Sequence, residues 1–225
     1  MKSQLKISCA FSEILGLLCA EGSYILQFSS YWGNDKGKKR FYKNHKSERI
    51  EFYNKDLKLL TRMQNLLLKE FNYSPKITKR NKLNICKRDI IKNILSQTIL
   101  DCLSWKVPLS VKHSDKNGKI SFIRGFFDGD GTASKSIRFF SINYSGLNEI
   151  FKLLKDLNFN PYFEKPQIKK KRKPLYSLRI SNTEKESFIN LIKPISKLPG
   201  CGGYIEVEAS CSLEQSLVKC AGLKY

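Results

Sequence analysis

One short pattern occurs twice in this chain and constrains its fold more than any other feature. The first copy spans residues 14–22 (ILGLLCAEG) and the second spans residues 123–131 (IRGFFDGDG). Each copy is an apolar run with small residues four positions apart, such as Gly16 and Ala20, followed by an acid and a glycine. Residues four apart share one face of a helix, so each copy predicts a helix with a smooth face. Two such helices can pack closely, and the duplication therefore predicts two similar halves in contact.

Each copy ends in an acidic residue, Glu21 or Asp130, before a glycine. We expect Gly22 and Gly131 to end the helices in a left-handed conformation. If the helices pair in parallel, both carboxylates meet at the negative ends of two helix dipoles, where a proton, water or a cation must offset their repulsion. Hard oxygen ligands favour Mg²⁺ or Ca²⁺. A single acid there is typical of an ordinary exposed helix end, whereas two copies in the same register favour a site.

Both copies resemble the nine-residue motif Leu-Ala-Gly-Leu-Ile-Asp-Ala-Asp-Gly that names the LAGLIDADG homing endonucleases. The eighth position of that motif is the metal-binding acid, so the resemblance implies that Glu21 and Asp130 bind metal and are catalytic. It further implies that the backbone at the seventh position, Ala20 and Gly129, reaches the metal through a carbonyl. The resemblance covers nearly the whole chain up to about residue 199.

The copies depart from the family motif at two positions. Leu15 and Arg124 replace the small second residue, and the sixth position is Cys19 in one copy and Asp128 in the other. The sixth position lies roughly 200° around the helix from the eighth, so it cannot share the same metal. We therefore expect the exchange Cys19→Ser to be nearly silent.

Charge indicates a nucleic-acid partner. The chain has 41 Lys and Arg against 20 Asp and Glu, a net charge of +21 on 225 residues, and a polyanion is the natural ligand of such a protein. Seven cysteines without a Cys-x-x-Cys pair predict neither a zinc site nor a disulfide framework. We expect an intracellular, reducing compartment, either a prokaryotic cytoplasm or an organelle. The sequence has no apolar run long enough to span a bilayer and shows no signal peptide, so we expect no contact with a membrane.

Hydrophobic periodicity predicts the same order of elements in both halves. The elements expected in the first half are helix 10–21, strands 23–32 and 41–53, helix 54–71, strands 76–78 and 82–86, and helix 88–103. A polar linker at 110–119 precedes the second motif helix, and strands at 132–143 and a helix at 145–157 follow it. Residues 158–161 (NFNP) then echo residues 72–75 (NYSP).

The predicted fold class is α+β, with two pseudo-symmetric αββαββα halves packed through their motif helices. Each sheet would be covered by helices on one face and bare on the other, and the two bare faces would form a saddle for DNA. The predicted units are a first half at 1–110, a linker at 111–118, a second half at 119–198 and a C-terminal tail at 199–225.

Basic residues gather in the turns and strands of this model, although a lysine run at a hairpin tip is also typical of a solvated turn, and a run of five could be a nuclear-import signal. A two-stranded ribbon fits the major groove of B-DNA, so these residues could contact bases or phosphates. The predicted DNA-binding residues are Lys36, Lys38, Lys39, Arg40, Lys76, Lys79, Arg80, Lys82, Lys135, Arg138, Lys169, Lys170, Lys171, Arg172, Lys173 and Arg179.

Polar residues near each acid could assist the chemistry. Asn54 and Asn143 close the second strand of their halves, and with Lys55 they are the candidates; helix capping is the alternative for both asparagines. Trp32 and Trp105 are expected to anchor the core or linker rather than to stack on bases. His45 and His113 lack a partner at metal-ligand spacing and receive no role.

Together these features predict a monomeric, site-specific homing endonuclease, intron-encoded, that makes an Mg²⁺-dependent double-strand break in a long asymmetric DNA target. Ca²⁺ or Mn²⁺ could substitute in binding or activity. The alternatives are an RNA maturase that binds its host intron RNA and an inactive DNA-binding protein on the same scaffold. Retention of both acids favours the nuclease. The absence of a terminal splicing cysteine, or of an asparagine before the C-terminal junction, favours a free-standing protein over an intein.

Overall fold

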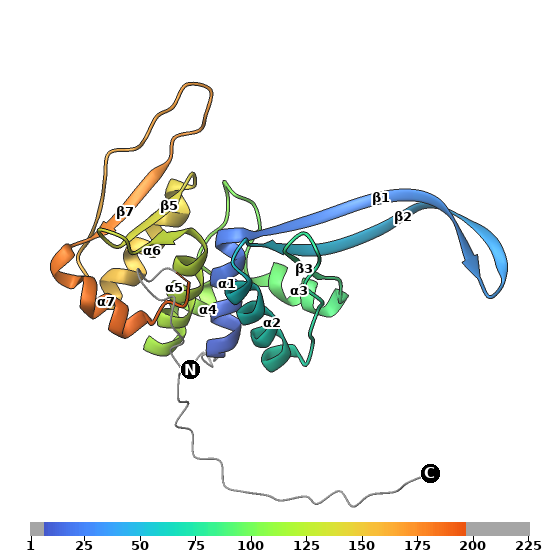
Figure 1. The fold of residues 1–225 in the computed structure, drawn as a ribbon, viewed down its shortest axis with the longest axis horizontal. Helices are drawn as coiled ribbons and strands as arrows, with labels where there is room; N and C mark the ends of the chain where they lie inside the picture. Colours follow the sequence, from blue (N-terminus) through green and yellow to red (C-terminus); the bar gives the residue numbers. More distant parts are fainter. Residues whose placement is uncertain (1–6, 197–225) are drawn as a thin grey trace, which may run out of the picture.

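The computed structural model describes residues 7–196, which form two halves packed side by side (Figure 1). The predicted tail at 199–225 lies outside the described residues. The first half consists of α1 (Cys9–Glu21), β1 (Gly22–Asp35), β2 (Lys38–Tyr53), α2 (Leu57–Phe71), β3 (Lys82–Ile85) and α3 (Arg88–Gln97). The second half consists of α4 (Leu109–Lys112), α5 (Lys116–Asp130), β4 (Gly131–Thr132), β5 (Arg138–Ser141), α6 (Tyr144–Asp156), β6 (Pro161–Phe163), β7 (Tyr176–Ile180), a 3-10 turn (Asn182–Glu184) and α7 (Lys185–Ile192).

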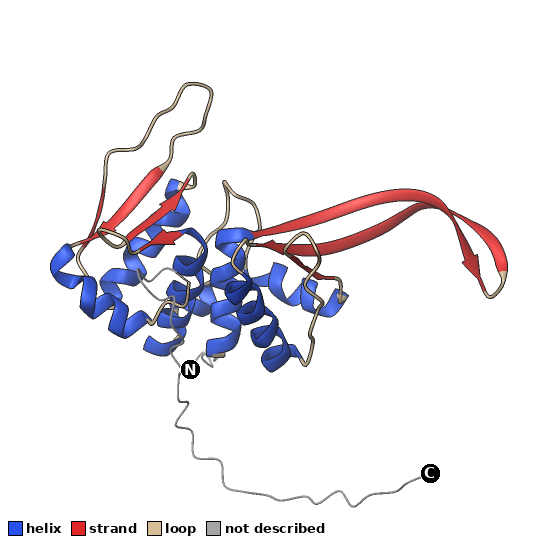
Figure 2. Ribbon diagram, viewed as in Figure 1, coloured by secondary structure: helices blue, strands red, loops and turns tan. Residues whose placement is uncertain are grey.

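Each half contributes one antiparallel sheet to the same side of the molecule, with most helices on the other side (Figure 2). The strand order is β1-β2-β3 in the first sheet and β4-β5-β7-β6 in the second. Alternation decides which face is covered: Ile50 and Phe52 of β2 are fully buried, whereas Glu51 between them is only half-buried. The mixed α/β architecture with two sheets is confirmed. No helix among residues 7–196 is long and apolar enough to cross a membrane.

The helices that cover the sheets form where the sequence has apolar residues at helical spacing and capping residues at the ends. In α2, the buried side chains recur at helical spacing, including Leu59, Met63 and Leu67. The helix begins where the carboxylate of Asp56 accepts a hydrogen bond from the backbone N–H of Lys58, and it ends at Asn72, whose φ of 47° is left-handed. These caps and the apolar stripe place α2 firmly under the first sheet.

Helices α1 and α5 pack against each other at the centre of the molecule (Figure 1). A Cβ added to Gly16 would collide with the carbonyl oxygen of Phe122, and one added to Gly125 would collide with that of Glu13. Backbone therefore touches backbone, with no room for a side chain between the helices. Because Gly16 faces the start of the second motif and Gly129 faces Ala20, the helices run in parallel. The predicted pairing of the two motifs is confirmed.

The glycines that end these helices serve a different purpose from the expected one. Gly22 has φ −87° and Gly131 has φ −100°, both extended, so the prediction of left-handed helix ends was wrong. A Cβ at Gly22 would clash with the backbone of Leu18, and one at Gly131 would clash with Phe127. Each helix turns directly into a strand at its motif glycine, and this close turn demands a residue without a side chain.

Three further expectations, two in the first half and one in the linker, were also wrong. Helix α3 stops at Gln97 rather than near residue 103, because the hydroxyl of Thr98 donates to the carbonyl of Lys106 (2.9 Å) and folds the following chain back. The expected strand at 76–78 is reduced to one isolated bridge. The polar stretch expected as a linker contains the first turn of α5, where the Asp115 carboxylate accepts from the N–H of Gly118 (2.9 Å).

The sixth motif position secures the chain that leaves each half. The thiol of Cys19 lies 3.7 Å from the hydroxyl of Thr98, just after α3. The carboxylate of Asp128 accepts hydrogen bonds from the backbone N–H groups of Ile195 (2.9 Å) and Ser196 (3.0 Å), just after α7. Equivalent positions thus anchor equivalent segments, one through a thiol and one through a carboxyl group.

Asp128 should make stability depend on pH. Burial raises the pKa of its carboxyl group from 3.8 to about 6, although the hydrogen bonds from Ser196 and Ile195 favour the charged form. The folded state therefore holds this proton more tightly than the unfolded chain. The stabilisation is complete below pH ~4 and is lost as the pH rises to ~6. Relative to Asp128→Asn, the wild-type free energy of unfolding should fall by up to about 3 kcal/mol across this window. Urea unfolding at pH 4 and pH 7 measures the difference, and parallel profiles would contradict it.

Candidate functional site

The two motif acids lie at the same end of the central helix pair. Glu21 is the last residue of α1 and Asp130 the last of α5, and both are half-buried. A Cβ built on Gly129 would lie 3.2 Å from Cγ of Glu21, so the side chain of one acid rests against the backbone of the other motif. Since β1 and β4 start at the next residues, the acids lie at the junction of the two sheets (Figure 1).

This junction has the chemistry of a hard-cation site with few protein ligands. Two carboxylates, with the carbonyls of Ala20 and Gly129 one residue before them, offer only oxygen donors, which suit Mg²⁺ or Ca²⁺. Among the described residues, no group of three or more His, Cys, Asp or Glu side chains could hold a metal ion. A cation here would keep positions open for water or substrate oxygens. Cys19 is unsuited to join, because burial raises the pKa of its thiol to about 12.

A pocket of about 210 Å³ opens beside the second acid. Asp130 lines it together with Ala20, Trp105 and Ser141, residues drawn from both halves and from the segment between them. Trp105 is only 2% exposed and its ring lies 4.8 Å from that of Phe126, which confirms its expected role as an anchor. The Asp130 side of the junction therefore has a hollow large enough for several water molecules.

Directly after the first motif, the bare face of the first sheet carries a carboxylate clamped by two cations. Ser23 pairs with Glu51, and Glu51 pairs with Asn84. The Glu51 carboxylate accepts from Nζ of Lys82 (2.8 Å) and from Nε of Arg49 (2.7 Å). Hydrogen bonds from these two groups lower the pKa of Glu51, so it stays charged at neutral pH.

The second sheet also holds one carboxylate between two cations, but there an arginine occupies the strand position that Glu51 occupies in the first sheet. Here Arg138 and Arg179 pair side by side in the row that follows the motif glycine. They share Glu164, whose carboxylate lies 3.2 Å from Nη2 of Arg138 and 3.4 Å from Nη1 of Arg179. The buried Nε atoms of both arginines find no hydrogen-bond partner among residues 7–196. Two guanidinium groups are thus held in place by one carboxylate, and their side chains remain 37% and 26% exposed.

Sequence reasoning placed Lys82, Arg138 and Arg179 on this surface but missed the acids that orient them. Glu51 carried a signal, since it lies between the buried strand residues Ile50 and Phe52 and so belongs to the bare face, whereas Glu164 follows the last residue of β6 and carried no such signal. Their partners depend on strand register, which the sequence pattern did not define.

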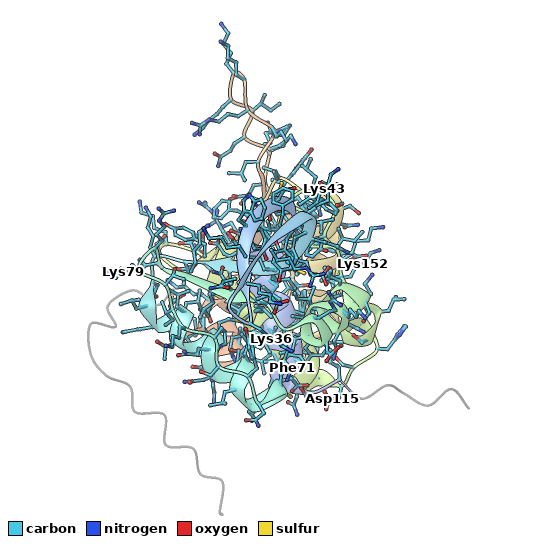
Figure 3. The ribbon with its side chains drawn as sticks, turned by 90° about the vertical axis from the view of Figure 1, so that its right-hand side faces the viewer. Lys36, Lys43, Phe71, Lys79, Asp115 and Lys152 are labelled. Carbon is cyan, nitrogen blue, oxygen red and sulfur yellow. The ribbon has the colours of Figure 1, made fainter. Side chains whose placement is uncertain are left out.

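The other predicted basic residues are exposed and lie in turns and loops around the two sheets or in the first residues of β2. Lys36 occupies the tip of the β1–β2 ribbon, and Lys79 lies at the edge of the first half, on the left in Figure 3. The loop between β6 and β7 rises above the second sheet (Figure 1). The exposed basic candidates are Lys36, Lys38, Lys39, Arg40, Lys76, Lys79, Arg80, Lys135, Lys169, Lys170, Lys171, Arg172 and Lys173.

The candidate asparagines use their side chains for structure. Asn143 is buried at the start of α6, where its Oδ1 accepts from the N–H of Gly146 (3.0 Å) and its Nδ2 donates to the carbonyl of Trp105 (2.7 Å). Asn54 accepts from the N–H of Asp56 (2.9 Å) and thereby shapes the turn before α2. Lys55 is exposed in that turn. These contacts correspond to the capping alternative for Asn143 and to a turn for Asn54.

Comparison with known proteins agrees with this arrangement. A family model described as a LAGLIDADG-like domain matches residues 117–193. The fold is similar to that of the homing endonuclease I-DmoI solved in complex with DNA and Mn, with a TM-score of 0.55, 20% identity, and coverage of 82% of this chain and 96% of that chain. It is also similar to the N-terminal LAGLIDADG domain of DUF199/WhiA, with a TM-score of 0.51, 18% identity and 88% of each chain covered.

A curated relative is a DNA polymerase of Methanocaldococcus jannaschii, 27% identical over 147 residues, or 63% of this chain. That alignment spans only 8% of the length of the polymerase. Fold and site thus define an α/β protein of two halves that joins paired motif helices beneath two sheets. Residues 117–193 of its second half match the LAGLIDADG-like family model, and the described chain as a whole has the fold of I-DmoI.

Proposed function

We propose that this chain is a site-specific DNA endonuclease that makes a metal-dependent double-strand break in a long asymmetric target. One observation carries the proposal: Glu21 and Asp130 converge at the parallel ends of α1 and α5, between two bare sheet faces. Two carboxylates at two negative helix ends do not stabilise the fold, but they can bind a cation held between the protein and a phosphate.

The residues present suit a divalent cation, for which Mg²⁺ is the proposed identity. Glu21 and Asp130 would hold it through carboxylate oxygens, with the carbonyls of Ala20 and Gly129 within reach. When bound, such an ion lowers the pKa of a water molecule and polarises a phosphodiester. I-DmoI has been solved in complex with DNA and Mn and in complex with DNA and Ca, which supports a divalent ion.

The chain's own groups position the DNA. On the second sheet, the guanidinium groups of Arg138 and Arg179, whose side chains are 37% and 26% exposed, would bind a backbone phosphate beside Asp130, and Glu164 fixes both guanidinium planes. On the first sheet, Lys82 and Arg49 flank Glu51 next to Glu21. Charged partners on both sides of the acids would align one strand of the duplex with each half.

Target length and asymmetry follow from the two halves. If each half covers about one helical turn, or ~10 base pairs, the target is on the order of 20 base pairs. The halves differ in strand number, and the long ribbon belongs to the first half alone. Their contacts must therefore differ, which makes an asymmetric target the natural ligand.

Both acids come from one chain, which supports a monomeric enzyme. We propose in addition that an intron encodes it. Cys9, Cys19, Cys86 and Cys102 are free. This supports a reducing compartment, either a prokaryotic cytoplasm or an organelle.

Selection followed by cleavage tests the proposal. A library of 40-base-pair duplexes with random centres, bound in Ca²⁺, should enrich one asymmetric site of about 20 base pairs. The enriched duplexes should then be cut on both strands in Mg²⁺ but much more slowly in Ca²⁺, because calcium coordinates more loosely. Gel electrophoresis of end-labelled strands measures both results. Enrichment without cutting in Mg²⁺ or Mn²⁺ would support an inactive DNA-binding protein, and selective capture of RNA would support a maturase.

A further inference from the structure

The β1–β2 ribbon extends well beyond the helices that cover the rest of its sheet (Figure 1). Its strands stay paired to the last residues before the turn, Asp35 and Lys38. Near the tip, Tyr31 pairs with Tyr42 and Trp32 pairs with Phe41. Successive strand residues point to opposite faces, so these two aromatic pairs lie on opposite sides of the ribbon.

One side continues the bare face of the sheet. Tyr31 and Tyr42 stack there with ring centres 5.3 Å apart, and the imidazole of His45 lies edge-on to both rings. The guanidinium of Arg40 lies 6.0 Å from the centre of the Tyr42 ring. This side contains the residues expected to face a DNA duplex, and we call it the duplex face.

The other side continues the face that the helices cover. Tyr24 pairs with the fully buried Ile50; Leu26 and Phe28 follow at every second residue of β1, and Trp32 lies four residues beyond Phe28. Contact of His45 with Tyr31 and Tyr42 shows that the irregularity after Ser29 preserves this alternation. The ribbon extends beyond the helices that cover this face of the sheet, so the same face is exposed to solvent there. We define the aromatic stripe as Leu26, Phe28, Trp32 and Phe41.

The aromatic stripe is unusually exposed for its composition. Phe28 is 62% exposed, Trp32 70% and Phe41 48%, and the Trp32 and Phe41 ring centres lie 5.2 Å apart. The expectation that Trp32 anchors the core or linker was wrong, because it lies on the part of the ribbon that no helix covers. Its aromatic neighbour Phe41 comes from the opposite strand, so the sequence showed no aromatic series around it. An exposed apolar patch of this kind marks an interaction site.

Lysines beside the aromatic stripe indicate which class of ligand it binds. Lys46 pairs with Phe28 and lies 3.6 Å from the carboxylate of Glu48, and Lys39 lies two residues from Phe41 and lines a pocket with Trp32. A second copy of the stripe would bring the same lysines together, so self-association is disfavoured. Flat rings interleaved with cations suit nucleobases joined by phosphates. Bases in a duplex are already stacked, so the ligand must offer unpaired bases.

We propose that the aromatic stripe binds a short unpaired segment of DNA, with bases stacked on Phe28, Trp32 and Phe41 and phosphates beside Lys39 and Lys46. This surface is distinct from the duplex face and needs no metal. The choice of DNA over RNA rests on the proposed function, since a duplex on the other face of the same ribbon would bring a displaced or cleaved strand within reach.

Trp32 itself provides the assay. The chain has two tryptophans, and Trp105 is buried, so a ligand that stacks on the stripe should quench the emission of Trp32 selectively. Titration of the full chain in EDTA with a 12-nucleotide oligo(dT) should quench it, whereas a blunt 20-base-pair duplex should not. Trp32→Phe should keep affinity for labelled oligo(dT) but lose the quenching signal. Trp32→Ala and Phe28→Ala should each weaken binding about tenfold.

Tyr31→Ala is the matched control, because it removes a ring from the duplex face of the same ribbon. It should change affinity for oligo(dT) by less than about twofold, while circular dichroism checks that all variants remain folded. The proposal is overturned if oligo(dT) leaves Trp32 emission unchanged, if Tyr31→Ala weakens binding as much as Trp32→Ala, or if the duplex quenches equally. Binding of oligo(U) alone would overturn the choice of DNA. Failure to cut DNA leaves this metal-free readout unaffected.

Discussion

Glu21→Gln and Asp130→Asn are each expected to abolish double-strand cleavage while leaving DNA binding intact or stronger. Either exchange removes a negative oxygen ligand at the end of α1 or α5, which weakens a bound divalent ion. It also relieves repulsion between the acids and from the DNA phosphates. We expect the rate of linearisation to drop by about 10²–10³-fold or more. A plasmid bearing the selected site, incubated with Mg²⁺, measures linearisation, and a gel-shift experiment in Ca²⁺ measures binding.

Cys19→Ser provides the control within the same helix. Its thiol lies 3.7 Å from the hydroxyl of Thr98, and a serine hydroxyl can replace the thiol in that contact. Cleavage by this variant should match the wild type within a few-fold. If either acid variant still linearises the plasmid at the wild-type rate, the assigned site is wrong. A parallel loss of binding would instead indicate misfolding, which thermal unfolding of the same samples detects.

Gly125→Ala should destabilise the whole molecule, because it inserts a methyl group between two helix backbones. The new Cβ would collide with the carbonyl oxygen of Glu13 and lie 2.9 Å from the backbone nitrogen of Leu17. Backbone atoms cannot rotate away as a side chain can, so α1 and α5 must separate. We expect the free energy of unfolding to fall by about 3 kcal/mol or more, at the upper end of overpacking effects. Urea denaturation followed by circular dichroism measures the loss.

Gly33→Ala is the matched control for this exchange. Its added Cβ would meet only side-chain rings, that of Tyr42 (2.9 Å) and that of Tyr31 (3.4 Å), on a ribbon where both rings are free to shift. The cost should stay below about 1 kcal/mol, since alanine is more favourable than glycine within a strand. Equal unfolding midpoints for the two alanine variants would contradict close backbone contact at Gly125.

The central architecture was predictable because it depends on the short-range spacing of small and apolar residues. The spacing of Gly16 and Ala20, repeated at Gly125 and Gly129, predicts smooth helix faces before any tertiary contact is known. Amphipathic spacing likewise predicts α2 and α6. The parallel pairing then followed from one duplication, which leaves few other ways to bury two such apolar helices.

Errors arose where distant segments compete with local preference. Periodicity favoured a helix to residue 103, but the hydrogen bond of Thr98 to Lys106 and the burial of Trp105 end α3 early. The polar run at Asp115 suggested a linker, although its carboxylate caps α5. Steric contact with Leu18, and not backbone conformation, selects Gly22. None of these contacts has a periodic signature.

The sequence by itself determined the duplicated helices, the acids at their ends and the positive charge suited to a polyanion, because each depends on residue type and short-range spacing. Only the tertiary structure decided that Glu164 joins Arg138 to Arg179 and that Trp32 lies on an uncovered face. Those features depend on which strand residues pair and where the covering helices stop. A shift of one residue in register would move every side chain to the other face, and periodicity alone cannot specify that register.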